Sequence, residues 1–150
     1  MAAGCSGPAH RPHWGLSSSQ GGPLLTGAAL PGVLVVDDES DMRLLVQEII
    51  ERANEGLTIV GQAASGQEAI DCWRQTGADV ILLDQRMPDM TGLETAERIL
   101  AEQPAQNIVL FSAYLDHATI RRASELGIRA CLPKSDLARI PEALWKYGAA

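Results

Sequence analysis

The stretch VLVVDD (residues 33–38) joins a short apolar run directly to two adjacent carboxylates. Three later apolar runs also end at a polar side chain: VILLD (80–84), IVLFS (108–112) and ACLPK (130–134). In an open parallel sheet the carboxyl ends of all strands lie at one edge, and ligands bind in the crevice there. We therefore expect the acids, the hydroxyl and the lysine to meet in one site, whose composition suits a hard cation and a phosphoryl group.

From Val33 onward, β-branched apolar runs alternate five times with stretches of helical composition. The expected strands cover residues 33–36, 57–63, 80–83, 107–111 and 129–132, and the expected helices cover residues 40–53, 66–76, 92–103, 116–126 and 136–147. The strands 80–83 and 107–111 are apolar throughout, as expected of strands covered on both faces. The alternation predicts an α/β fold with a doubly wound, five-stranded parallel sheet and right-handed crossovers.

Local signals mark two helix starts and one buried helix face. Ser65 and Thr91 are each followed three residues later by a glutamate. This is the pattern of a capping box, in which the hydroxyl covers an open amide and the glutamate reaches back. In the first expected helix, Leu45, Ile49 and Ala53 recur at i, i+4 and i+8, which predicts that this stripe faces the sheet.

Composition separates a tail from a folded domain. Residues 1–32 are rich in Gly, Pro, Ser and Ala and carry Arg11 as their one charged side chain, so we expect a disordered N-terminal tail. Residues 33–147 are expected to form one domain, and residues 148–150 a short C-terminal tail. The net charge of the chain is −7, which argues against direct binding of nucleic acid.

The hydropathy and the cysteine content of the chain indicate in which cellular compartment it acts. No apolar stretch approaches the roughly 20 residues that a membrane-spanning helix needs. Three cysteines, Cys5, Cys72 and Cys131, show neither metal-ligand spacing nor an obvious disulfide framework. We therefore expect a reducing, cytoplasmic environment and no direct contact with a membrane.

Four motifs of the chain resemble the receiver domain of two-component response regulators: VVDDE (35–39), LLDQRMPDMTG (82–92), FSAY (111–114) and LPK (132–134). The resemblance extends over about residues 33–147. It implies a flavodoxin-like (βα)5 fold with strand order 2-1-3-4-5, which agrees with the alternation of strands and helices. It also implies that the chain is a single-domain response regulator.

The resemblance implies a Mg²⁺ site at the strand ends. Asp38 and Asp84 would coordinate the ion directly, together with the backbone carbonyl of Arg86, and Asp37 would hold it through water. Mg²⁺ prefers oxygen ligands, keeps some of its waters and bridges carboxylate to phosphate. Carboxylates about 4 Å apart repel one another by roughly 1–4 kcal/mol per pair, so such a cluster without a cation would be a poor structural choice.

The same resemblance implies that Asp84 is the phosphoacceptor. It would take a phosphoryl group from a sensor histidine kinase, a phosphotransfer protein or a small acyl phosphate. Lys134 would pair with the phosphoryl oxygens, and Ser112 would move toward the attached group and hydrogen-bond it. The chain would then catalyse only its own phosphorylation and dephosphorylation, and it would not be an enzyme in the ordinary sense.

The resemblance also predicts an interaction face that responds to phosphorylation. Cys131 stands where the family usually has an aromatic residue, three positions before the lysine, and Tyr114 is the nearest substitute. Arg86 and Tyr114 occupy positions that influence hydrolysis of the phosphoryl group in the family. The expected face includes Ile120, Arg121, Cys131, Leu137 and Leu144. It would bind a downstream protein or a second copy of the chain.

Three alternatives stay open at the level of sequence. A receiver-like interaction module that works without phosphorylation is favoured by Cys131 but opposed by the complete set of acids. A Mg²⁺-dependent aspartyl phosphatase would need Asp-x-Asp at one strand end, whereas Gln85 and Arg86 follow Asp84. A flavin-binding module would need a phosphate loop after the first strand, where the acids would repel phosphate.

Overall fold

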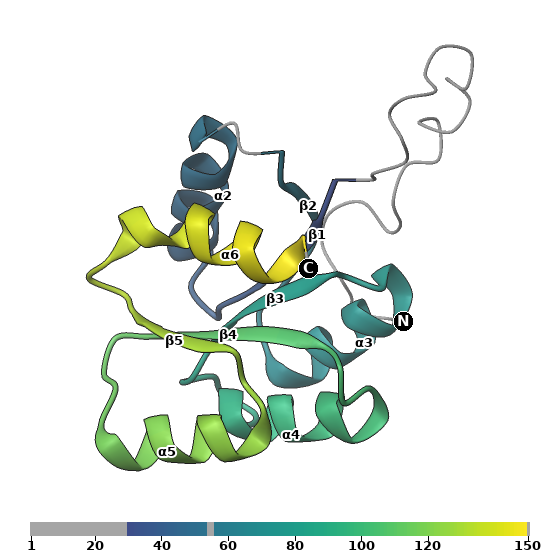
Figure 1. Cartoon of the computed structure of the whole chain (residues 1–150), viewed down its shortest axis with the longest axis vertical. Coiled ribbons are helices and arrows are strands. Elements are labelled where there is room, and N and C mark those ends of the chain that lie inside the picture. Colours follow the sequence, from purple (N-terminus) through teal and green to yellow (C-terminus); the bar gives the residue numbers. More distant parts are fainter. Residues whose placement is uncertain (1–29, 54–55, 150) are drawn as a thin grey trace.

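A five-stranded parallel sheet forms the centre of the computed structural model, which describes residues 30–53 and 56–149 (Figure 1). Its strands are β1 (Gly32–Val36), β2 (Thr58–Ala63), β3 (Val80–Asp84), β4 (Asn107–Ser112) and β5 (Ala130–Pro133). They lie in the order β2-β1-β3-β4-β5, and every neighbouring pair is parallel. The predicted α/β fold and strand order are confirmed. Of the predicted disordered tail, residues 1–29 lie outside the described residues, and Gly32 already belongs to β1.

Helices cover both faces of the sheet. They are α2 (Ser40–Ala53), α3 (Gly66–Thr76), α4 (Gly92–Glu102), α5 (His117–Leu126) and α6 (Ile140–Gly148), with a 3-10 turn η3 (Leu137–Arg139) before α6. Figure 1 shows α2 and α6 on one face and α3, α4 and α5 on the other. None of the helices in the described part of the chain combines the length and apolar character that crossing a bilayer requires.

The last helix differs from its predicted bounds of 136–147. A 3-10 turn comes first, and the α-helix begins only at Ile140. Pro141 explains this break, because it has no N–H to close an α-helical bond back to Leu137 and it is best placed in the first turn of a helix. Helix α6 continues to Gly148, which lies within the segment expected as the C-terminal tail.

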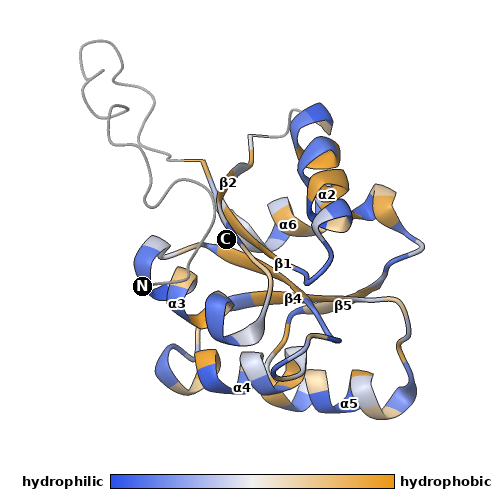
Figure 2. Cartoon of the chain, turned by 180° about the vertical axis from the view of Figure 1, so that it is seen from behind, coloured by the Kyte–Doolittle hydropathy of each residue, from blue (hydrophilic) through white to orange (hydrophobic). Residues whose placement is uncertain are grey.

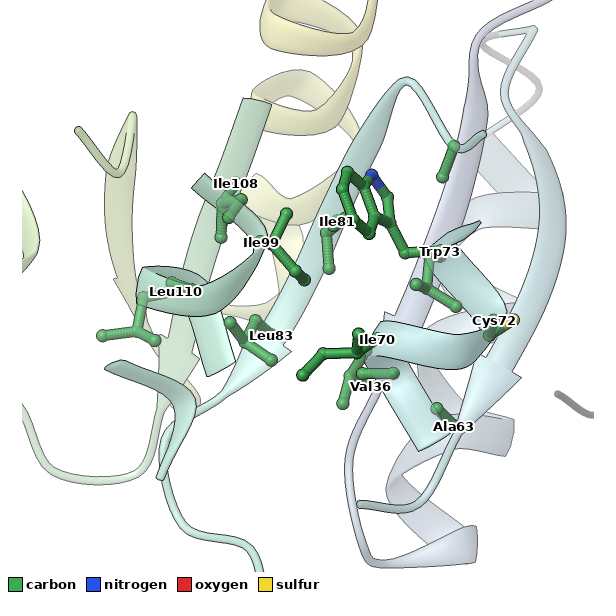
Figure 3. Packing of buried hydrophobic residues seen from close by; sticks show 14 of the residues in the cluster. Val36, Ala63, Ile70, Cys72, Trp73, Ile81, Leu83, Ile99, Ile108 and Leu110 are labelled. Carbon is green, nitrogen blue, oxygen red and sulfur yellow. The ribbon is translucent and has the colours of Figure 1, made fainter. Parts of the chain in front are cut away.

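An apolar layer on each face of the sheet holds the helices in place. Figure 3 shows one of them, in which Trp73 of α3 and Ile99 of α4 lie near Ile81 of β3. The other layer contains Val46 of α2 and Leu144 of α6. Figure 2 shows apolar strands between helices whose surfaces carry many polar residues. Each buried large aliphatic side chain contributes roughly 1.5–3 kcal/mol to this packing.

Helix α2 turns a different stripe to the sheet than its spacing predicted. Val46 and Ile50 are buried and Met42 packs beside them, whereas Leu45 is 39 % exposed. The prediction that Leu45 faces the core is therefore wrong. Adjacent apolar residues on α2 permit more than one rotation of the helix, and packing against the sheet selects the one that buries Val46 and Ile50.

The two predicted capping boxes have different outcomes. At α4, Thr91 accepts a hydrogen bond from the amide of Glu94, and the Glu94 carboxylate accepts one from the amide of Thr91. At α3, Ser65 accepts from the amide of Glu68, but the Glu68 carboxylate reaches the amide of Ala64. The second box is therefore only half formed.

Candidate functional site

The carboxyl ends of the strands bring the polar residues predicted from the sequence to one edge of the sheet. Asp37 follows β1, and Asp84 is the last residue of β3. Ser112 is the last residue of β4, and Lys134 follows β5. The ammonium nitrogen of Lys134 lies 2.7 Å from Asp37 Oδ2 and 3.2 Å from Asp84 Oδ1. Residues far apart in sequence thus form one cluster, in which the partly buried Lys134 pairs with two buried acids.

Backbone hydrogen bonds position this cluster. The amide of Asp37 donates to the carbonyl of Ala63 at 3.0 Å, which extends the pairing of β1 with β2 by one residue. The amide of Lys134 donates to the carbonyl of Ser112 at 2.8 Å, which does the same for β4 and β5. Arg43 of α2 donates from Nη1 to the carbonyl of Asp37 at 2.7 Å. The charged side chains therefore stand on strand ends that the main chain holds rigidly.

Burial and charge shift the protonation of the cluster. Burial, and after it the charge of Asp37, raises the pKa of Asp84 to about 6, against the opposing effect of Lys134. Burial acts to lower the pKa of Lys134, but its ion pairs with Asp37 and Asp84 raise that pKa above the ordinary value. The ammonium also lies 5.8 Å from the centre of the Phe111 ring, within cation–π range. Lys134 therefore stays charged at neutral pH.

Three carboxylates fit a hard cation. One oxygen each from Asp37, Asp38 and Asp84 lies within 4.8 Å of the other two, and Asp38 is the exposed member. Asp37 Oδ2 is buried, and its close polar neighbour is the ammonium nitrogen of Lys134, 2.7 Å away, with which it forms an ion pair. Oxygen donors with excess negative charge and an opening to water are the ligand set that Mg²⁺ prefers.

The loop between β3 and α4 carries Arg86 along this edge. The backbone amide of Arg86 acts to lower the pKa of Asp84, so this amide lies next to the carboxylate. Gln85 closes the base of the loop, because its carbonyl accepts from the amide of Gly92 at 2.8 Å and its side chain accepts from the amide of Leu93 at 2.9 Å. A Cβ atom on Gly92 would lie 2.3 Å from the carbonyl oxygen of Asp84. Only glycine permits this close approach.

Ser112 lies at the site, but its hydroxyl faces its own loop. The Oγ atom donates to the carbonyl of Tyr114 at 3.1 Å and accepts from the amide of Tyr114 at 3.3 Å. In the residues that the structure describes, no hydrogen bond joins this hydroxyl to Asp84 or Lys134. The side chain of Tyr114 points away from the core, and this residue is 64 % exposed. The hydroxyl is therefore free for a ligand only after the local pair with Tyr114 opens.

The expected interaction face needs one correction. Ile120 and Arg121 are exposed on α5, and Cys131 and Leu137 are half buried. Leu144, in contrast, is fully buried. It packs in the apolar layer beneath α6, so the prediction that Leu144 belongs to an exposed face is wrong.

Asp89 is the principal residue near the site that the sequence did not indicate. Its carboxylate accepts hydrogen bonds from the amides of Gly66 and Gln67, each at 2.9 Å. The partners are 23 and 22 residues away in sequence. A contact between residues so far apart leaves no local sequence pattern. The helix start predicted at Ser65 does imply open backbone amides that need an acceptor.

Comparisons with known proteins agree with this arrangement. The family model for the response regulator receiver domain matches residues 33–144. The chain is 31 % identical to the chemotaxis protein CheY of Thermotoga maritima over 115 residues, which cover 76 % of this chain and 94 % of that protein. It is 38 % identical over 104 residues to protein-glutamate methylesterase/protein-glutamine glutaminase 3 of Hahella chejuensis, over 68 % of this chain. That match spans only 29 % of the methylesterase.

A solved structure shows the same fold. The two-component response regulator of the LuxR family from Aurantimonas sp. SI85-9A1 superposes with a TM-score of 0.73 at 28 % identity. The superposition covers 77 % of this chain and 82 % of that one. The arrangement of strands that assembles the acidic edge is thus shared with a structure of known family.

Proposed function

The chain belongs to the response regulator receiver domain family, and on that premise we propose that residues 33–147 act as the phosphoacceptor domain of a two-component system. A sensor histidine kinase, a phosphotransfer protein or a small acyl phosphate would supply the phosphoryl group. One observation carries the proposal: Asp84 stands at the end of β3 inside a cluster of three carboxylates, and its Oδ1 lies 3.2 Å from the ammonium nitrogen of the partly buried Lys134.

The proposed reaction is a transfer of the phosphoryl group to Asp84. An oxygen of the Asp84 carboxylate attacks phosphorus, the P–N bond of a donor phosphohistidine breaks, and the freed imidazole takes up a proton. With a pKa of about 6, Asp84 is mostly ionised above neutral pH and is available as the nucleophile. Lys134 would pair with the phosphoryl oxygens, because such transfers depend mainly on positioning and charge neutralisation.

A Mg²⁺ ion fits the same residues. Asp38, Asp84 and the carbonyl of Arg86 would hold it directly, and Asp37 through water. When bound, the ion neutralises negative charge on the phosphoryl oxygens and on the acids around it. The excess of carboxylates over the single ammonium in the cluster supports this assignment.

Phosphorylation would act on the surface of α5 and β5. The attached group adds about −1.5 to −2 of charge. Ser112 would leave its local pair with Tyr114 and turn toward the group, and the loop that begins α5 would follow. The surface around Ile120, Arg121 and Cys131 would then bind a downstream protein or a second copy of the chain, in the cytoplasm. No external substrate is turned over in this proposal.

Intact mass spectrometry tests the phosphoacceptor. After incubation with acetyl phosphate and Mg²⁺, the wild-type chain should gain one phosphoryl group, and EDTA should prevent the gain. Asp84→Asn should gain none. Asp41→Asn, which changes an acid in the first turn of α2, is the matched control and should behave as wild type. An equal adduct on Asp84→Asn would contradict the assignment.

A further inference from the structure

Asp89, in the loop between β3 and α4, lies against the first turn of α3. Its Oδ1 accepts from the amide of Gly66 and its Oδ2 accepts from the amide of Gln67, each at 2.9 Å. Oδ1 also accepts from the amide of Met90 at 2.9 Å, which braces the carboxylate. Slight burial acts to raise the pKa of Asp89, but the hydrogen bonds from Gln67 and Gly66 lower it below its ordinary value. Both the helix dipole and the open amides favour a carboxylate at this position.

The contact between this loop and α3 also leaves no room for a side chain at Gly66. A Cβ atom on Gly66 would lie 2.3 Å from Met90 Cγ and 2.6 Å from Thr95 Oγ1. The loop therefore sits directly on the start of α3. The local cap of this helix is a different residue, Ser65, which accepts from the amide of Glu68 at 3.1 Å. Asp89 is thus a tertiary tether that joins two separate elements.

Asp89, the tethering residue, follows shortly after Arg86 in the same loop. Gln85 closes the base of the loop, and Asp89 fastens its tip to α3. Between them, the amide of Arg86 lies close enough to the Asp84 carboxylate to act to lower its pKa. Pro88 fixes its own φ angle, so the chain from the tether back to Arg86 has few ways to move. Release of the tip would give the Arg86 peptide freedom that it now lacks.

We propose that Asp89 is a positioning residue for the cation: by tying the loop to α3, it holds the backbone of Arg86 beside the acidic cluster and strengthens Mg²⁺ binding. The inference rests on the proposed function, since it concerns the same ion. Asp89 acts through the loop and does not touch the cation. Residues that support metal ligands from outside typically change affinity by about 10–100-fold, and we expect about tenfold here.

A Mg²⁺ titration of the full chain tests this inference. The dissociation constant is measured from amide NMR shifts in wild type, Asp89→Ala, Asp89→Asn and Ser65→Ala. Ser65→Ala is the matched control, because it removes a hydrogen bond from the same helix end without releasing the loop. Asp89→Asn removes the charge as fully as alanine does, but it keeps one oxygen that can accept from a helix amide. If Asp89→Ala fails to fold, the comparison of Asp89→Asn with Ser65→Ala takes its place.

If Asp89 tethers the loop, the loss of Mg²⁺ affinity should be graded across the variants. Asp89→Ala should weaken Mg²⁺ binding about tenfold, Asp89→Asn should weaken it less, and Ser65→Ala should leave it unchanged. In the metal-free protein, Asp89→Ala should also speed hydrogen exchange at the amides of Gly92 and Leu93, which donate to Gln85. Neither amide bonds to Asp89, so faster exchange there would report release of the whole loop.

Four outcomes would overturn the inference, and they differ in what else they affect. Equal losses in the asparagine and alanine variants of Asp89 would assign the effect to charge. Equal losses in Asp89→Ala and Ser65→Ala would assign it to helix stability. Wild-type Mg²⁺ affinity in Asp89→Ala would show that Asp89 does not support Mg²⁺ binding, while leaving the proposed function intact. A wild-type chain that binds no Mg²⁺ would overturn both.

Discussion

Lys134 balances two buried acids with one charge. The exposed fractions of the side chains of Lys134 and Asp37 are 14 % and 3 %, and that of Asp84 is 4 %. Buried charges are costly unless they are paired, and a third carboxylate, Asp38, lies nearby. Burial, and after it the negative charge of Asp37, raises the pKa of Asp84 to about 6. The free chain therefore carries an unfavourable ionised group at the position that the proposed chemistry needs.

Asp84→Asn should stabilise the metal-free protein in a pH-dependent way. Because the folded-state pKa of Asp84 is about 6 and its ordinary value is 3.8, ionisation of this group favours the unfolded state. At pH 8 in EDTA, the variant should gain on the order of 3 kcal/mol in unfolding free energy. The gain should shrink as the pH falls through about 6 and should vanish near pH 4, where the wild-type carboxyl is protonated.

Urea unfolding at several pH values measures this gain. Glu48→Gln, which removes a charge from an exposed position on α2, is the control and should show little change at any pH. A gain for Asp84→Asn that stays constant between pH 4 and pH 8 would contradict the raised pKa.

Two loops at the carboxyl edge of the sheet are held very differently. The loop between β3 and α4 is fastened at its base by Gln85 and at its tip by Asp89. In the loop between β4 and α5, Ser112 bonds instead to the backbone of Tyr114, two residues away. Local contacts of this kind open more readily than tertiary ones. The first loop is thus fixed at two points by tertiary contacts, whereas Ser112 in the second is held by one local pair.

Gly92→Ala should destabilise the start of α4. The new Cβ would meet the carbonyl oxygen of Asp84 at 2.3 Å, and this backbone atom belongs to a buried strand and cannot easily move. We expect a loss of about 2 kcal/mol in unfolding free energy. Gly148→Ala is the control, because its new Cβ would lie 3.0 Å from Val80 Cγ1, an atom of a side chain. Similar losses in both variants would contradict the close approach at Gly92.

Tyr114→Ala should weaken the response to phosphorylation more than Cys131→Ala does, while both variants still accept phosphate. A half-buried thiol offers less area and fewer distinct orientations than an aromatic ring. The response must therefore depend more on Ser112, Lys134 and Tyr114. Amide NMR shifts across α5, recorded before and after phosphorylation, measure this response. Loss of the shifts in Cys131→Ala together with intact shifts in Tyr114→Ala would show that Tyr114 does not replace the missing ring.

For the molecule as a whole, the acidic edge couples ligand binding to global stability. The candidate ligands come from the ends of β1 and β3 and from the following loop, and these central strands are covered on both faces. A cation that needs this arrangement cannot bind the unfolded chain in the same way. Binding should therefore stabilise the entire domain.

Mg²⁺ should raise the melting temperature of the wild-type chain. At 100 times the dissociation constant, linkage gives about 2.7 kcal/mol of added stability. Asp38→Ala should gain much less from Mg²⁺, and without metal it should be at least as stable as wild type, because it removes like-charge repulsion. Glu48→Ala is the control for loss of a negative charge on α2. Equal thermal shifts in the wild type and Asp38→Ala would count against the proposed ligand set.

Local sequence patterns were enough to predict the strands and helices and the residue types of the site. Apolar runs such as residues 80–83 predict buried strands because their length and β-branched content suit a sheet covered on both faces. The parallel arrangement then implies that Asp37, Asp84, Ser112 and Lys134 meet at one edge. These inferences succeed because they depend on local pattern and on the general geometry of parallel sheets.

Tertiary packing determined how the strands, helices and loops fit together. It selected Val46 over Leu45 as the buried residue of α2, and it placed Leu144 in the core. It also joined Asp89 to the start of α3 across 22 and 23 residues of sequence. Helical periodicity permits several rotations of a helix, and contacts between distant segments leave no local pattern. Only the packing of whole elements against the sheet settles such choices, because that packing determines which side chains lose contact with water.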